Sequence, residues 1–134
     1  MAETSARQRI VEAPPSFVAP LEGEKAARFK ADSMLIPSPA QIRDAIAAIP
    51  CGSSKTVLEL RQELAQACNA GVTCPFAMSV GWRLVAHAAE EDRAEGSTEV
   101  TPWWRLTRDK KPDPKMPGGI ENHRSLLAKE GIAV

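Results

Sequence analysis

Residues 56–93 read TVLELRQELAQACNAGVTCPFAMSVGWRLVAHAAEEDR, and this stretch decides the fold class. Thr56 begins it, and Glu59 follows three residues later, which is the spacing of a capping box at the start of a helix. Leu60 and Leu64 then fall on one face at helical spacing. We therefore expect a helix that begins near Thr56 and buries one apolar face.

The second half of this stretch predicts a longer helix after a short turn. Residues 69–74 contain an asparagine and a glycine, which tolerate left-handed backbone, and Pro75 suits the first position of a new helix. From Phe76 to Ala88 apolar residues recur every four positions, so the helix should run to about Arg93. Two helices and a short turn have the dimensions of a helix-turn-helix, but an ordinary packed pair of helices would show the same pattern.

The residues before this pair predict one more helix and a short strand. Ser38 and Gln41 have the spacing of a second capping box, with Pro39 at the first helical position. Pro50 ends this helix, because proline cannot continue it. A minor strand is expected near residues 33–36, directly before the helix.

We divide the chain into an arm and one domain. Residues 1–32 hold scattered prolines and charges without a sustained period, so we expect a flexible or loosely docked N-terminal arm. Residues 33–134 are then a single domain, because 134 residues are enough for one core and too few for two.

Composition narrows the function classes. The 17 Lys and Arg residues balance the 17 Asp and Glu residues, so any nucleic-acid binding must use a local basic patch. No apolar run approaches the roughly 20 residues that span a bilayer, and the N-terminus lacks the apolar core of a signal peptide. The three cysteines are an odd number without metal-ligand spacing. We therefore expect a reduced, cytoplasmic monomer with no membrane contact, metal or cofactor.

The C-terminal third is organised around residues 101–105, TPWWR. Two adjacent indoles are costly to place, because each N–H needs a partner when it is buried. Residues 108–119 hold prolines and glycines that exclude regular structure. A short amphipathic helix follows, carries Leu126 and Leu127, and stops at Gly131.

This order of elements resembles the C-terminal DNA-binding domain of the O6-alkylguanine-DNA alkyltransferases and their alkyltransferase-like relatives. That domain has an Ile-Pro-x-Gly turn, a Thr- or Ser-capped helix, a second helix, a Pro-Cys-His-Arg motif, a Gly-Gly loop and a last helix ending Leu-Leu-x-x-Glu-Gly. The matching segments here are 49–52, the helix from Thr56, 75–93, 102–105, 117–119 and 126–131. The resemblance covers about residues 35–132, and it implies a mainly α, winged-helix-like domain with a helix-turn-helix.

The resemblance also implies that the chain is not an enzyme. Family alkyltransferases take the alkyl group onto the cysteine of Pro-Cys-His-Arg, a thiolate that the neighbouring histidine activates. Trp103 stands in place of that cysteine and Trp104 in place of the histidine. An indole is neither a nucleophile nor a useful base at neutral pH. Glu130 matches the glutamate that orients the histidine in the enzymes, but here that histidine is absent.

Tryptophan in place of the cysteine is the pattern of the alkyltransferase-like proteins, which bind O6-alkylguanine in DNA without repairing it and flag the lesion for repair. Such a protein flips a base out of the stack into a pocket, where an aromatic wall supplies about 1–3 kcal/mol per base. Trp103 and Trp104 are the candidates for that wall, and their alternative is the hydrophobic core. Met78 matches the arginine that replaces the flipped base in the family, and an apolar wedge there can also enter a base step.

The helix pair offers three further candidates for contact with DNA. Thr56 and the amides behind it can bind a phosphate at a helix N-terminus, or Thr56 can serve only as a cap. Ser79 and Arg83 fall at four-residue spacing on one face of the second helix. That face lies against a duplex groove, or it is the ordinary solvated side of an amphipathic helix.

The last candidates lie in a basic segment after the helix pair. Residues 105–115 hold five cations against two acids. Arg105, Lys110 and Lys111 are the cations that we expect near DNA, and each phosphate they neutralise would steepen the salt dependence of binding. Their alternative role is an ordinary solvated loop.

Together these features predict a non-enzymatic protein that binds double-stranded DNA. The more specific form of this hypothesis is a sensor of O6-alkylguanine or a related altered base, which flips the base and recruits repair proteins. The alternative is a helix-turn-helix domain for regulation or protein interaction, without lesion recognition. Binding of duplexes with and without the lesion separates the two.

Overall fold

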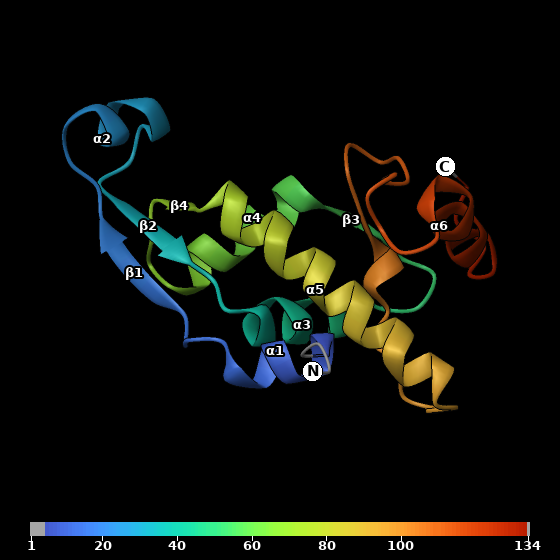
Figure 1. Ribbon diagram of the computed structural model, residues 1–134. Helices are drawn as coiled ribbons and strands as arrows, with labels where there is room; N and C mark the ends of the chain where they lie inside the picture. The colour runs from blue at the N-terminus through green and yellow to red at the C-terminus, as the bar shows by residue number, and fades with distance from the viewer. Residues whose placement is uncertain (1–4, 134) are drawn as a thin grey trace.

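The computed structural model describes residues 5–133 (Figure 1). The helices are α1 (Ala6–Glu12), α2 (Gly23–Phe29), α3 (Pro39–Ala47), α4 (Val57–Ala67), α5 (Pro75–Ala94) and α6 (Gly119–Ala128), with a 3-10 turn, η1 (Trp103–Arg105), before α6. The strands are β1 (Phe17–Pro20), β2 (Ser33–Ile36), β3 (Lys55–Thr56), β4 (Val72–Thr73) and β5 (Leu106–Thr107). The described part of the chain is therefore an α/β fold in which helices predominate, rather than a purely helical one.

The strands form two small sheets. In the first, β1 lies antiparallel to β2 with Phe17 opposite Ile36, and β4 lies parallel to β2 on its other side. In the second, β3 pairs in parallel with β5, and Lys55 lies opposite Leu106. The strand expected at residues 33–36 is confirmed as β2. The first sheet and α2 lie at one end of the molecule and α6 at the other, with α3, α4 and α5 between them (Figure 1).

The predicted helix starts are confirmed, because each depends on side chains close in sequence. Ser38 accepts a hydrogen bond from the Gln41 N–H at the start of α3. At the start of α4, Thr56 and Glu59 complete both halves of the capping box. Pro75 occupies the first turn of α5, which ends one residue beyond the expected Arg93. The helix pair of the sequence prediction therefore consists of α4 and α5.

Helix α5 is the central element of the core. Its inner face carries Met78, Trp82 and Val85, all fully buried or nearly so. Helix α3 packs across it and buries Ile42 and Ile46. Gly81 makes this crossing possible, because a Cβ at that position would overlap the Cδ1 atom of Ile42. The position of the Ile42 side chain against α5 therefore depends on the missing side chain of Gly81.

Replacing Gly81 by alanine is expected to lower the free energy of unfolding by about 1–3 kcal/mol, the usual cost of overpacking a core. The double variant Gly81→Ala with Ile42→Val removes the obstructing Cδ1, so its loss should be smaller than the sum of the two single losses. Urea unfolding of all four proteins measures this coupling. Strict additivity would contradict the close contact.

The segment before β2, for which a flexible or loosely docked arm was expected, contains regular structure that packs on the domain. Residues 5–32 contain α1, β1 and α2, and α1 packs on α5 with Ala6 and Ile10 buried. The backbone N–H groups of Ala6 and Arg7 donate to the carboxylate of Glu91, at 2.8 and 3.1 Å. These two hydrogen bonds thus come from a residue more than 80 positions away, which local periodicity does not reveal.

Candidate nucleic-acid interface

The two adjacent indoles of residues 101–105 lie in the turn η1. Trp103 is fully buried, and its carbonyl oxygen accepts a hydrogen bond from the Trp82 indole N–H at 3.1 Å. The ring of Trp104 lies edge-on to that of Trp103 and is partly exposed. Of the two roles considered for Trp103, wall of a base-holding pocket or part of the hydrophobic core, its burial matches the core.

Trp104 and Arg105 both bind Glu130 at the end of the last helix. The Trp104 indole N–H donates to Oε2 at 2.8 Å, and the Arg105 Nε donates to Oε1 at 2.9 Å. Arg105 also donates to the Ile49 carbonyl at 2.7 Å, and the Gly52 N–H donates to Glu130 at 3.1 Å. We call this group the Glu130 clasp. Both carboxylate oxygens of Glu130 thus accept hydrogen bonds, although the chain lacks the histidine that this glutamate orients in the alkyltransferases. Arg105 binds a backbone carbonyl of the protein itself.

The surroundings of Glu130 in the clasp favour the ionised form of its carboxyl group. Burial by itself raises the pKa of this carboxyl group, but the hydrogen bonds from Arg105, Gly52 and Trp104 outweigh it and lower the pKa. A carboxylate with several donors and little exposure is a structural anchor. We therefore assign Trp104 and Arg105 to positioning of η1 and α6 rather than to direct contact with DNA.

A buried histidine, missed as a site residue in the sequence prediction, holds the following loop in place. His123 of α6 is fully buried, and its Nδ1 accepts the Asp113 N–H at 3.0 Å. Its Nε2 lies 3.0 Å from the Trp104 carbonyl oxygen, which requires the proton on Nε2. His123 lies on the inner face of the amphipathic helix α6 with Leu126 and Leu127. Its spacing to these two leucines is the feature of the sequence that could have predicted its burial.

The ordinary pKa of histidine is about 6.5. Below this pH we expect the free energy of unfolding to fall as the pH falls. Burial lowers the pKa of His123, so the unfolded chain takes up a proton that the folded chain resists. The stability that neutral His123 contributes is complete above the pKa of this histidine in the unfolded chain, and it is lost progressively below that pH. Thermal melts across this window should show the loss in the wild type and in the exposed-site control His87→Gln, and a weaker loss in His123→Gln. Identical slopes in all three would contradict the assignment.

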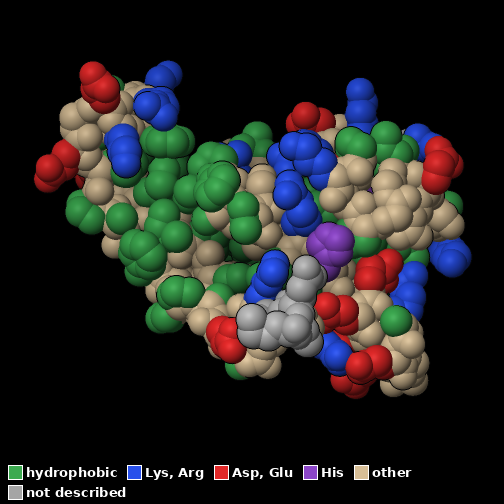
Figure 2. Space-filling view, in the orientation of Figure 1, with side chains coloured by type: hydrophobic (Ala, Val, Ile, Leu, Met, Phe, Trp, Pro, Cys, Tyr) green, Lys and Arg blue, Asp and Glu red, His purple; other side chains and the backbone are tan. Residues whose placement is uncertain are grey.

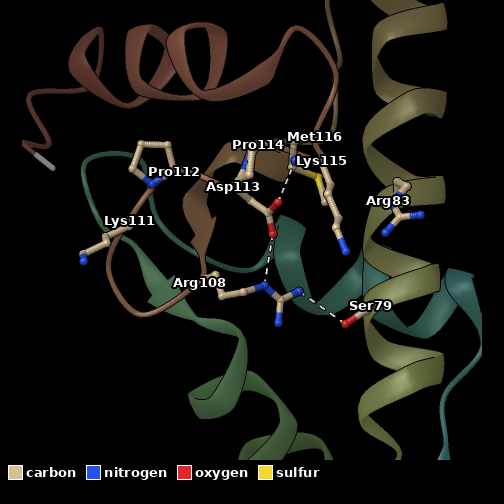
Figure 3. A pocket seen from close by; sticks show the side chains of 9 residues that line it. All are labelled: Ser79, Arg83, Arg108, Lys111, Pro112, Asp113, Pro114, Lys115 and Met116. Carbon is tan, nitrogen blue, oxygen red and sulfur yellow. Dashed lines mark hydrogen bonds and ion pairs between the residues drawn. The ribbon is translucent and has the colours of Figure 1, made fainter.

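Residues 108–116 form a loop whose conformation depends on Asp113. This carboxylate is buried, and it accepts the Lys115 N–H at 2.8 Å and the Arg108 Nε at 3.0 Å. Burial raises the pKa of Asp113, but these two hydrogen bonds outweigh it and lower the pKa. Arg108 also donates to the Ser79 hydroxyl at 3.2 Å and so joins the loop to α5, as Figure 3 shows.

Between this loop and α5 lies a solvent-open cleft of about 470 Å³ (Figure 3). Its lining consists of Ser79, Arg83, Arg108, Lys111, Pro112, Asp113, Pro114, Lys115 and Met116. Four of these side chains are cationic, and the single carboxylate among them, Asp113, is already paired with Arg108. We call it the basic cleft. Figure 2 shows Lys and Arg side chains gathered in the same region, beside the middle of α5.

The basic cleft brings together three of the predicted site residues, namely Ser79, Arg83 and Lys111. Two others, Thr56 and Lys110, line a separate hollow of about 170 Å³ with Lys55 and Thr107. The Thr56 hydroxyl accepts the Glu59 N–H at 3.1 Å, so it acts as the helix cap. The basic cleft also contains Arg108 and Lys115, cations of the predicted basic segment that were not singled out as site residues.

Met78 does not occupy the position that an intercalating wedge requires. It is fully buried, because it lies one turn before Trp82 on the inner face of α5. The prediction that Met78 inserts between base steps is therefore wrong for this structure. The exposed apolar side chains of α5 are instead Phe76 and Val80.

Comparison of the chain with protein-family models, curated proteins and solved structures finds no match. Within residues 5–133, no group of three or more His, Cys, Asp or Glu side chains is placed to hold a metal ion. None of the helices described here is both long enough and apolar enough to cross a membrane. The geometry of the basic cleft is therefore the main evidence about function.

Proposed function

We propose that this protein is a non-enzymatic DNA-binding protein whose basic cleft contacts the phosphate backbone of a duplex. The observation that carries the proposal is the convergence of four cations from α5 and the loop onto one open cleft. Such a local concentration of cations favours binding of a polyanion, because contact with duplex phosphates releases the counter-ions condensed on the DNA. Ser79 adds a hydroxyl of the kind that also contacts phosphate oxygens.

The charge distribution along α5 sets how the duplex lies. Arg83 and the exposed His87 follow Ser79 on the outer side of the helix. The acidic residues 90–92 lie beyond them, and α1 binds Glu91 there. We infer that only the first half of α5 approaches DNA, because the acidic end would repel phosphate.

The finer proposal is an alkyltransferase-like domain of the winged-helix type that senses an altered base. It rests on the resemblance of residues 35–132, since Trp103 lies in the core and Trp104 binds Glu130. An extruded base would enter the basic cleft rather than contact the buried Trp103. The cleft volume lies within the range of about 300–1,000 Å³ that is usual for small-ligand sites. Pro112, Pro114 and Met116 supply apolar walls, and Arg108 supplies hydrogen-bond donors.

The test is a titration of labelled duplexes, with and without a central O6-methylguanine, followed by fluorescence anisotropy at two salt concentrations. Salt-sensitive binding of both duplexes supports DNA binding, and tighter binding of the modified duplex supports lesion sensing. Failure to bind either duplex at low salt would contradict both. We expect the protein mass to stay unchanged after incubation with the modified duplex, because no nucleophile occupies the reactive position.

A further inference from the structure

One face of the first sheet is apolar and only partly covered, since Phe17 is exposed, Ala19 and Ile36 are half-buried, and Met34 is buried. The register pairs Phe17 with Ile36 and Ala19 with Met34, so these four side chains share one face of the sheet. Leu35 points to the opposite face and is buried in the core. The solvated face of an antiparallel pair normally carries polar side chains. Here all four residues are apolar, and burial by the rest of the chain accounts for Met34 but not for Phe17, of which 55% is exposed.

This face is the floor of a groove between α2 and the start of α5. The groove has a volume of about 480 Å³ and is lined by Ala19, Pro20, Leu21, Lys25, Arg28, Phe29, Met34, Ile36, Cys74, Pro75 and Phe76. We call it the apolar groove. Phe76 forms one side, and 77% of its surface is exposed. Figure 2 shows hydrophobic side chains gathered over β1, β2 and the first part of α5.

The arrangement distinguishes the groove from ordinary surface hydrophobics. Single exposed apolar residues such as Leu58 are common and need no explanation. A contiguous patch beside a concave surface is characteristic of an interaction site. The volume accommodates a few side chains, which suits a short segment of chain better than the flat face of a folded domain.

Charge indicates the kind of segment that fits. The lining includes two cations, Lys25 and Arg28, and no acidic residue. Neither cation is among the ion pairs of the described residues, so both are available to a ligand. An occupant with carboxylates beside its apolar side chains would complement both properties of the groove.

We propose that the apolar groove binds a short, acidic, amphipathic segment of another protein. Its large apolar side chains contact Phe76, Phe29 and Ile36, and its carboxylates pair with Lys25 and Arg28. This site is separate from the basic cleft and shares no lining residue with it. The proposal therefore does not depend on the DNA-binding function.

The experiment uses the full chain and a displayed library of random linear peptides. Peptides are selected on the wild type and counter-selected on Phe76→Ser. We expect the enriched peptides to combine aromatic or aliphatic residues with Asp or Glu. A labelled enriched peptide should bind the Lys25→Glu, Arg28→Glu double variant on the order of tenfold more weakly, since each variant turns an attraction into a repulsion. Leu58→Ser, an exposed apolar residue outside the groove, is the matched control and should bind normally.

Several results would overturn the proposal. These are failure to enrich peptides over the Phe76→Ser background, enriched peptides without acidic residues, and equal binding to the charge-reversed variant. Two further results would assign the groove to a different occupant. One is Phe76-dependent binding to vesicles of anionic lipid without peptide binding, and the other is self-association that Phe76→Ser abolishes. Thermal melts of each variant confirm that a loss of binding is not a loss of folding.

Discussion

Reversing the charge of Arg83 and Lys111 together is expected to weaken duplex binding on the order of tenfold at low salt. Both side chains line the basic cleft, one from α5 and the other from the loop. Each phosphate contact that is lost should also lower the slope of log affinity against log salt by about 0.9. Anisotropy titrations at several salt concentrations give both quantities.

The matched control carries the same change of charge at another place. Lys25→Glu with Arg28→Glu alters the net charge by the same amount, but these residues line the apolar groove. We expect this variant to keep most of the wild-type affinity for DNA. Equal weakening of the two variants would mean that overall charge, and not the basic cleft, governs binding.

Trp103→Ala is expected to lower the free energy of unfolding by about 3–5 kcal/mol, the usual cost of truncating a large buried aromatic side chain. The ring is fully buried and lies against His123, with 5.2 Å between ring centroids. Trp103→Phe should cost much less, because it keeps a ring and removes an indole N–H that has no partner among the described residues. Urea unfolding of the three proteins measures both losses.

Phe76→Ala serves as the control for removal of an aromatic ring. Phe76 is largely exposed, so its truncation should change stability by no more than about 0.5 kcal/mol. If Trp103→Ala were equally mild, the indole would have to lie in an open pocket instead of the core. That outcome would restore the base-holding role that the structure argues against.

The sequence was sufficient for the elements whose determinants are local. The Ser38 and Thr56 caps, and Pro75 at the start of α5, are each set by side chains within a few residues. The strand β2 was also placed correctly. At the three helix starts, the hydrogen bonds or the fixed proline angle act within one turn of chain, so spacing alone identifies them, whereas β2 pairs with strands distant in sequence.

Burial and tertiary docking could not be predicted in the same way. Met78 has helical spacing with the buried Trp82 and Val85, but the family motif assigned it to the DNA-facing side by its position alone. The docking of α1 depends in part on Glu91, which lies 85 positions from Ala6 along the chain. The site residues carried over from the family motif were assigned by position along the chain, and position does not tell a buried ring from an exposed one.

The Glu130 clasp also affects how long the folded state lasts. It joins the turn at residues 49–52 to a carboxylate 78 positions later, whereas the contacts within α4 and α5 are local. Contacts between distant residues carry the larger loop-closure entropy, so they tend to form late in folding. Interactions that are absent from the folding transition state slow unfolding without speeding folding. We therefore expect Trp104, through its hydrogen bond to Glu130, to act mainly on the lifetime of the native protein.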